Sequence, residues 1–216
     1  QEKAIGKAEA KVIIAYHYSQ MLRYYGGMPW IDHAYTAEDE MKFPRMTVEQ
    51  TVEKIVDLLD EAADTLPWEV DADNDGHLTK AAAIALKSRV LLFAASPLFN
   101  ADEPYLQGDA SAQFITWYGN YSADRWQKAL DAGLQFMREN NGRYKLVNTG
   151  NPREDFAAGY FNRHNGEVLI SSRRFTTYMT GKTPFAQIRY GVASPTLNYI
   201  DMFQMNDGTE LSLIHI

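Results

Sequence analysis

Residues 79–100 (TKAAAIALKSRVLLFAASPLFN) decide the fold that the sequence predicts. Thr79 can cap the free amides at the start of a helix, and Pro97 ends that helix at about Ser96 because proline lacks the backbone donor. Small side chains cover much of this helix, so other helices can approach it closely. The small residues are Ala81, Ala82, Ala83, Ala85, Ala94 and Ala95.

An apolar stripe upstream predicts a second helix. Thr47 and Gln50 have the spacing of a capping box, in which each side chain binds the backbone N–H of the other. Pro67 ends the segment. The stripe has helical spacing and must face a partner helix, and it consists of Val48, Val52, Ile55, Val56, Leu59, Ala63 and Leu66.

Two further helices complete the pattern. Residues 2–24 have apolar residues at helical spacing, and Gly26 and Gly27 end this first helix because glycine accepts a positive φ. Downstream, Ser122 caps a fourth helix that ends at Asn141-Gly142.

Four helices in two antiparallel pairs are typical of tetratricopeptide-like helix hairpins. The connections are longer than that repeat allows, so we expect a mostly α, irregular helical-repeat scaffold over residues 1–147. Residues 148–210 change to short segments rich in Thr, Gly and aromatics. They predict a loop-rich part with little strand, in which residues 167–172 are the best strand candidate.

The last six residues, 211–216 (LSLIHI), break this pattern and match a translated sequencing adaptor. We hypothesise that they are an artefact and exclude them from the fold. Genomic DNA that continued with the same six codons would contradict this hypothesis.

Composition excludes several classes of protein. The chain has 216 residues and a net charge of −7, without a Lys or Arg run that could follow a phosphate backbone, so no nucleic acid partner is expected. No stretch approaches the roughly 18 consecutive apolar residues of a transmembrane helix. The absence of cysteine excludes disulfides, thiol nucleophiles and Cys-ligated zinc.

Four landmarks occur in a fixed order: residues 9–29, ending in YYGGMP; residues 45–67, with TVE and DEAA; residues 79–100, followed by WQKA at 126–129; and residues 194–208, with SPT and NDG. Together they resemble the SusD/RagB family of Bacteroidota nutrient-binding lipoproteins. Each landmark alone is weak, because alanine-rich helices and Asp-Gly turns are common, but four in register are specific.

The resemblance implies a SusD-like fold and a function. Proteins of this family are exported and tethered to the outer membrane by a lipidated N-terminal cysteine. They hold oligosaccharides for a SusC-like TonB-dependent transporter without cleaving them. We therefore expect a fragment of a surface-exposed, lipid-anchored protein, whose anchor is missing from this sequence.

Sugar binding requires flat apolar faces with hydrogen-bonding groups nearby. One stretch supplies Trp117, Tyr118 and Tyr121. The favoured stretch follows the fourth helix, where the resembled family places part of its glycan surface. It supplies Tyr160, Phe161, Arg163, Arg173, Arg174, Phe175 and Tyr178.

Other aromatic residues have competing interpretations. Packing under a loop is the alternative for each single candidate of the two binding stretches. We expect Tyr24, Tyr25, Phe99 and Trp126 in the core, whereas Trp30 and Trp68 fit either the core or a transporter interface.

Asp71, Asp73 and Asp75, followed by Gly76, match the start of a calcium loop. The twelfth position is Ala82 instead of the bidentate Glu, and it falls within the predicted third helix. A solvated acidic turn is therefore favoured and no cofactor is expected, with a weak calcium site as the alternative.

The sequence gives no support for catalysis. The five histidines show no metal-ligand spacing, and no Gly-x-Ser-x-Gly motif occurs. A glycosidase needs two carboxylates a few ångströms apart, which sequence alone does not reveal. The acidic residues of the second helix fit a solvated face: Glu49, Glu53, Asp57, Asp60, Glu61 and Asp64.

Two alternatives from other classes stay open. One is a helical-repeat scaffold that binds a peptide or protein through a concave surface. The other is a helical carbohydrate-active enzyme. Arg163, Arg173 and Arg174 fit an acidic sugar, a peptide carboxylate or a neighbouring aspartate equally well, and the sequence does not select a particular glycan.

Overall fold

The computed structural model describes residues 2–36, 38, 40, 42–171, 196–200, 202–205 and 208–209. The chain divides into two compact units, unit 1 (Gln1–Ser172) and unit 2 (Arg173–Ile216). Within the described residues there is no strand, so the mostly α prediction is confirmed. The helices are α1 (Glu2–Tyr25), α2 (Val48–Ala63), the 3-10 helix η1 (Ala72–Asn74), α3 (Lys80–Ala94), α4 (Asp109–Ala112), α5 (Ala123–Asn140), α6 (Pro152–Phe161) and, in unit 2, α8 (Leu197–Ile200).

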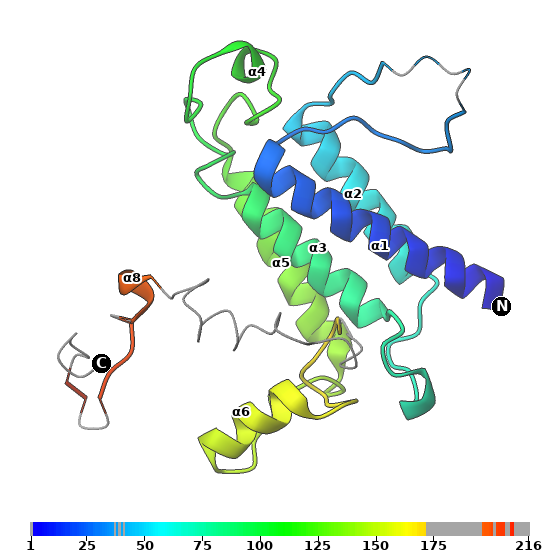
Figure 1. The fold of residues 1–216 in the computed structure, drawn as a ribbon, viewed down its shortest axis with the longest axis vertical. Coiled ribbons are helices and arrows are strands. Elements are labelled where there is room, and N and C mark those ends of the chain that lie inside the picture. Colours follow the sequence, from blue (N-terminus) through cyan, green and yellow to red (C-terminus); the bar gives the residue numbers. More distant parts are fainter. Residues whose placement is uncertain are drawn as a thin grey trace, which may run out of the picture. The chain divides into compact units, whose positions relative to one another are not determined.

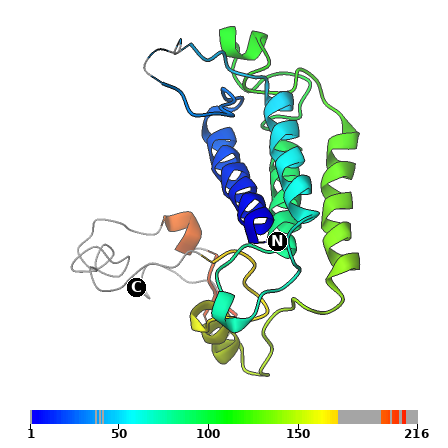
Figure 2. The ribbon, with the colours of Figure 1, turned by 90° about the vertical axis from the view of Figure 1, so that its right-hand side faces the viewer.

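Helix α3 is the central helix of unit 1 (Figure 1). It packs against α2 and α5, while α1 packs mainly against α2 and also touches α3. The four long helices run antiparallel in chain order, so the expected helix-hairpin scaffold is present. Within the described helices, α2 and α5 share no contact, and Figure 2 shows them as separate columns beside α3.

The predicted helix caps are present. Thr47 Oγ1 accepts the N–H of Gln50 at 3.1 Å, and Gln50 Oε1 accepts the N–H of Thr47 at 3.0 Å, which completes the capping box. Thr79 and Ser122 cap α3 and α5 by a single hydrogen bond each, because Thr79 Oγ1 accepts the N–H of Ala82 at 3.2 Å and Ser122 Oγ that of Asp124 at 3.3 Å. Asn141 ends α5 in the left-handed conformation with φ of 48°.

The core lies between α1, α2 and α3. The alanines at 81–83 are fully buried, and the absence of longer side chains there allows the neighbouring segments to approach α3 closely. Each fully buried Val, Leu or Ile contributes roughly 1.5–3 kcal/mol. The largest fully buried apolar side chains are Leu22, Ile55, Leu59, Ile84, Val12 and Val48.

Gly26 and Gly27 form a junction where three distant segments meet, and we call it the glycine junction. The N–H of Gly27 donates to Ile115 O at 2.6 Å, and the N–H of Val48 donates to Phe114 O at 2.9 Å. The end of α1, the start of α2 and the segment before α5 are thereby joined through backbone groups.

Both glycines are required by close approach. Gly26 has φ of 76°, and a Cβ there would collide with the carbonyl of Ile115. A Cβ on Gly27 would collide with the carbonyl of Met46. Arg45 Nε also donates to Gly27 O at 2.8 Å, so the carbonyl of this turn is satisfied.

The structure differs from the sequence prediction after α5. Residues 152–161 form α6 instead of a loop, and unit 1 continues past residue 147 to include it. The strand expected at 167–172 is wrong over its described part, because residues 167–171 form a turn, a bend and irregular backbone. Asn165 accounts for this, since its side-chain oxygen accepts the N–H groups of Glu167 and Val168 at 3.0 and 3.1 Å.

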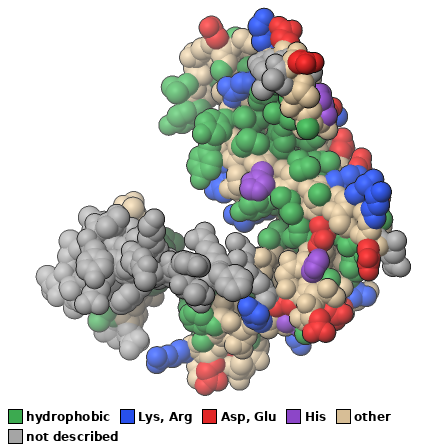
Figure 3. Space-filling model, turned by 45° about the vertical axis from the view of Figure 1, so that its right-hand side comes forward, with side chains coloured by type: hydrophobic (Ala, Val, Ile, Leu, Met, Phe, Trp, Pro, Cys, Tyr) green, Lys and Arg blue, Asp and Glu red, His purple; other side chains and the backbone are tan. Residues whose placement is uncertain are grey.

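The aromatic residues for which the core was the expectation, or one of two alternatives as for Trp30 and Trp68, separate into two groups. Phe99 is buried, and Trp30 and Trp68 pack partly against the core. Tyr24 and Tyr25 are 76% and 64% exposed, so the expectation that they are core residues is wrong, because the last turn of α1 directs Leu22 inward instead. Figure 3 shows hydrophobic side chains gathered on the upper half of unit 1, towards the end where α1 finishes.

No helix among the described residues combines the length and the apolar character that crossing a membrane requires.

We expect Gly27→Ala to lower the free energy of unfolding by about 1–3 kcal/mol, because the added Cβ overpacks the junction and forces the backbone segments apart. Gly6→Ala is the matched control, since Gly6 lies in α1 and a Cβ there meets nothing within 4 Å. That substitution should stabilise the protein by about 0.5–1 kcal/mol through helix propensity. Urea unfolding followed by circular dichroism measures both, and equal effects of the two substitutions would contradict the role of the junction.

Candidate functional site

Three exposed side chains of α6 form what we call the aromatic surface: Phe156, Tyr160 and Phe161. The rings of Phe156 and Tyr160 stack with centroids 5.9 Å apart and planes inclined by 11°. Tyr160 and Phe161 meet edge to face at 5.1 Å. The three residues are 71%, 75% and 73% exposed, so flat apolar faces are open to solvent.

Asparagine side chains hold α6 at both ends. Asn151 Oδ1 accepts the N–H of Arg153 at 3.1 Å at the start of the helix. At the other end, Asn165 Nδ2 donates to the carbonyls of Gly159 and Asn162 at 3.1 and 2.7 Å. The helix has no buried residue, so these caps and the following turn support it in place of core packing.

The segment that carries α6 is tied to the helical scaffold. Tyr144 OH donates to Trp68 O at 3.1 Å, which fixes the segment to the connection between α2 and α3. The side chain of Asn140, at the end of α5, pairs with the backbone of Tyr144 at 2.7 and 2.8 Å. The N–H of Lys145 donates to Gly166 O at 3.0 Å, which closes the loop around α6.

Arg163 is the predicted polar residue of this surface that the structure describes. It lies two residues after α6, is exposed, and forms no ion pair or hydrogen bond with another described residue. Four further predicted binding residues lie outside the described residues: Arg173, Arg174, Phe175 and Tyr178.

The other predicted stretch, residues 117–121, does not form one continuous exposed surface. Trp117 is only 9% exposed, and its Nε1 donates to Ser111 O at 2.9 Å. The prediction that its ring faces a sugar is therefore corrected, because the ring is buried and its nitrogen is already bonded to the backbone of α4. Tyr121 is 51% exposed and keeps an open face.

Tyr118 lies under a guanidinium group. The Arg125 Cζ atom is 3.9 Å from the centroid of the Tyr118 ring, a cation–π contact, and Arg125 is held there by hydrogen bonds to Asn100 and Asn120. Burial raises the pKa of Tyr118 to about 12; nearby Glu49 and Glu53 add to this rise, and Arg125 opposes it. The phenol therefore stays a hydrogen-bond donor throughout the neutral range.

The acidic turn does not gather metal ligands. Asp71 Oδ1 accepts the backbone and side-chain N–H groups of Asn74, both at 2.9 Å, and caps η1. Among the described residues no group of three or more His, Asp or Glu side chains is placed to hold a metal ion. Asp71, Asp73 and Asp75 therefore do not converge as a calcium loop requires.

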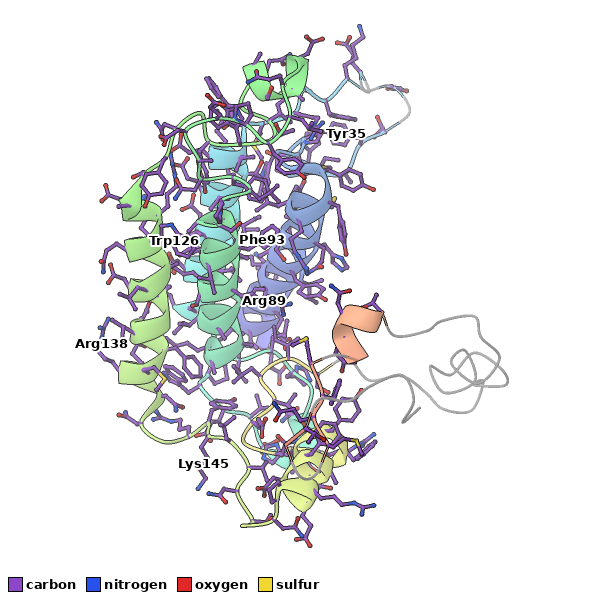
Figure 4. The ribbon with its side chains drawn as sticks, turned by 90° about the vertical axis from the view of Figure 1, so that its left-hand side faces the viewer. Tyr35, Arg89, Phe93, Trp126, Arg138 and Lys145 are labelled. Atoms are coloured by element: carbon purple, nitrogen blue, oxygen red, sulfur yellow. The ribbon has the colours of Figure 1, made fainter. Side chains whose placement is uncertain are left out.

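A cavity of about 390 Å³ lies between α1 and α3 and is bordered by Trp126 of α5. Phe93 and Trp126 lie at similar heights on this face of unit 1 (Figure 4), and Arg23 lies 5.4 Å from the Phe93 ring. Trp126 is 39% exposed, so the expectation that it is a core residue is wrong. Trp126 does lie on the predicted fourth helix. Helical spacing does not show, however, that α1 and α5 stay apart here and leave one side of this residue uncovered.

Comparisons with known proteins give a consistent result. Residues 2–92 match the model of the SusD-like family, which is described as starch-binding and associating with the outer membrane. A search of curated proteins finds no match.

Solved structures extend the likeness beyond that segment. The protein BT4246 is 30% identical with a TM-score of 0.59 over 67% of this chain. A SusD-like protein from Bacteroides fragilis gives a TM-score of 0.68 over 98% of this chain at 24% identity, and a SusD superfamily protein from Bacteroides vulgatus gives 0.59 over 94% at 19%. The two latter matches establish the fold. The chain covers 26%, 37% and 38% of these three proteins, respectively.

We expect Tyr118→Phe to change the pH dependence of stability. Tyrosine has a pKa near 10 when unfolded and Tyr118 about 12 when folded. The folded state therefore binds the proton more tightly, and the stability that this group contributes is present below pH 10 and lost as the pH rises towards 12. Urea unfolding between about pH 9 and pH 11.5 should show a smaller loss for Tyr118→Phe than for the wild type. Tyr121→Phe, at an exposed position, should keep the wild-type slope, and parallel curves for all three proteins would contradict the assignment.

Proposed function

Because this chain belongs to the SusD/RagB-like family, we propose that it is part of a cell-surface protein that binds oligosaccharides without cleaving them and delivers them to a SusC-like TonB-dependent transporter. The family description supports glycan binding and the association with the outer membrane. The lipid anchor and the transporter partner go beyond that description and are proposed from the resemblance to the family.

The aromatic surface is the observation that carries the binding proposal. Three aromatic residues that are 71–75% exposed on one helix leave a large apolar area in water, and such patches commonly mark binding sites. The C–H face of a pyranose ring can stack on Tyr160 and its neighbours. Arg163 supplies hydrogen-bond donors for the sugar hydroxyls at the same end of α6.

Binding without cleavage requires no carboxylic acid that is tuned to donate a proton. A glycosidase needs one carboxylic acid whose pKa is raised so that it can donate a proton. The two described carboxyl groups with a clearly shifted pKa shift the other way. A hydrogen bond from His33 lowers the pKa of Asp32, and hydrogen bonds from Gln135 and Lys80 lower that of Glu139.

We expect the double substitution Phe156→Ala and Tyr160→Ala to weaken oligosaccharide binding about ten-fold. Each aromatic contact contributes about 0.5–1.5 kcal/mol beyond its buried area, and 1.4 kcal/mol corresponds to a factor of ten. Isothermal titration against a panel that includes malto-oligosaccharides measures the affinity. Tyr105→Ala is the control, because Tyr105 is 82% exposed in a different loop and should leave binding unchanged.

The same titration also tests the absence of cleavage. Chromatography of the sugar after incubation should recover it intact. Unchanged affinity in the double variant would contradict the site, and reducing ends released by the pure protein would contradict the non-catalytic function.

A further inference from the structure

A second groove lies between α2 and α5, on the flank of α3 opposite to the cavity at Trp126. Its volume is about 540 Å³, within the range of pockets that hold small ligands. Helix α3 forms the floor and separates α2 from α5, which do not pack closely against each other. Apolar side chains line part of the floor and walls: Val52, Val56, Leu91 and Ala132.

The two walls carry opposite charge. On α2, Glu49, Glu53 and Asp57 follow one another at intervals of four residues and form an acidic row of about 12 Å. On α5, Arg125, Lys128 and Arg138 form a basic row, with Asp131 between them. Each row therefore presents a predominant sign of charge to the groove.

None of these six charged groups forms an ion pair with a described residue. Two of the other charged groups at the groove are paired: Lys87 binds Asp60 at 2.7 and 2.8 Å, and Lys80 binds Glu139 at 3.1 Å. Asp131 accepts a hydrogen bond from the neutral amide of Gln127 at 2.9 Å and keeps its charge, so three cationic groups and one carboxylate without a described ion-pair partner face the groove from α5. The two rows attract each other, but α3 holds them too far apart to pair.

Tyr118 and Arg125 stand at one end of the groove. Arg125 is fixed by Asn100 and Asn120 and does not need to reorganise when an anion arrives. No described group accepts a hydrogen bond from the Tyr118 hydroxyl, which leaves this donor for a ligand. Opposed charges on the walls of a cleft set up a field across it, because the protein walls have a low dielectric constant.

We propose that this groove is a ligand site distinct from the aromatic surface, and that it binds a dipolar molecule whose ammonium group faces α2 and whose carboxylate faces α5. A neutral glycan would leave both rows unpaired, and a polyanion would meet the acidic wall. A molecule with both charges and a short carbon skeleton satisfies the two rows and covers the apolar floor. A short peptide and a saccharide that joins an amino sugar to a uronic acid both have this chemistry.

Titration of the whole chain with matched probes tests the proposal. The peptide arm uses Lys-Ala-Ala-Glu with blocked termini, beside the blocked peptides Lys-Ala-Ala-Lys, Glu-Ala-Ala-Glu and Gln-Ala-Ala-Gln. The sugar arm uses a disaccharide of glucosamine with a free amine and glucuronic acid, beside its N-acetylated form. We expect the dipolar probe of at least one arm to bind five-fold or more tightly than every control of that arm, and the arm that binds identifies the source.

Single charge removals locate the site. Glu53→Gln and Arg138→Gln should each weaken the dipolar probe about three- to five-fold, as expected for partly exposed ion pairs, and glutamine preserves helix propensity. Glu103→Gln and Lys7→Gln remove the same charges at exposed positions outside the groove and should leave binding unchanged. Raising the salt concentration should weaken the wild-type complex.

Equal affinity for all probes in both arms would overturn the proposal, and so would Glu53→Gln and Arg138→Gln proteins that bind as the wild type does. The test is separate from that of the aromatic surface. Phe156→Ala with Tyr160→Ala should leave the dipolar probe unaffected, and Glu53→Gln should leave neutral oligosaccharides unaffected.

Discussion

The close approach of three backbone segments at the glycine junction is the constraint on which the rest of unit 1 depends. Gly27 is held by Ile115 O at 2.6 Å and by Arg45, and neither Gly26 nor Gly27 has room for a Cβ. The junction joins the end of α1 to the start of α2, and it also fixes the segment that precedes α5. The order of the helices therefore depends on backbone hydrogen bonds between segments that are distant in the chain, from Gly27 to Ile115 and from Val48 to Phe114.

Small residues on α3 allow close helix packing on both of its flanks. Buried alanines at 81–83 let the neighbouring segments pack closely around α3, and a Cβ on Gly133 of α5 would lie 3.4 Å from Ser88 Oγ. Because α3 is the shared neighbour, α2 and α5 remain apart on one flank, and Trp126 stays partly exposed on the other. The two cavities of about 540 and 390 Å³ follow from this central position of α3.

The two proposed binding surfaces use different physical chemistry. The aromatic surface offers flat rings on a helix that is held by capping and by turns, so its selectivity rests on stacking and on a few donors such as Arg163. The groove between α2 and α5 offers two fixed rows of opposite charge above an apolar floor. A scaffold of packed helices can support both, because the first surface lies on a loop-borne helix and the second lies between helices of the core. Both proposals rest on side chains that decorate the fold shared with SusD-like structures, because the fold alone does not determine a ligand.

The sequence by itself determined the local structure. Thr47, Thr79 and Ser122 marked the starts of three helices, and the structure confirms all three caps, because capping depends on residues within one turn. The helix α6 could have been found in the same way, from Asn151 followed by Pro152 and from the four-residue spacing of Phe156 and Tyr160.

Tertiary structure alone decided which residues are buried and which distant residues lie side by side. Trp117 is buried and Tyr121 exposed within one loop, although both are aromatic and four positions apart. Glu49, Glu53 and Asp57 form a solvated helix face, as their spacing predicts, but they become one wall of a groove only because α3 places a basic row of α5 opposite them. Such relations depend on contacts between distant segments, and no local pattern of residues encodes them.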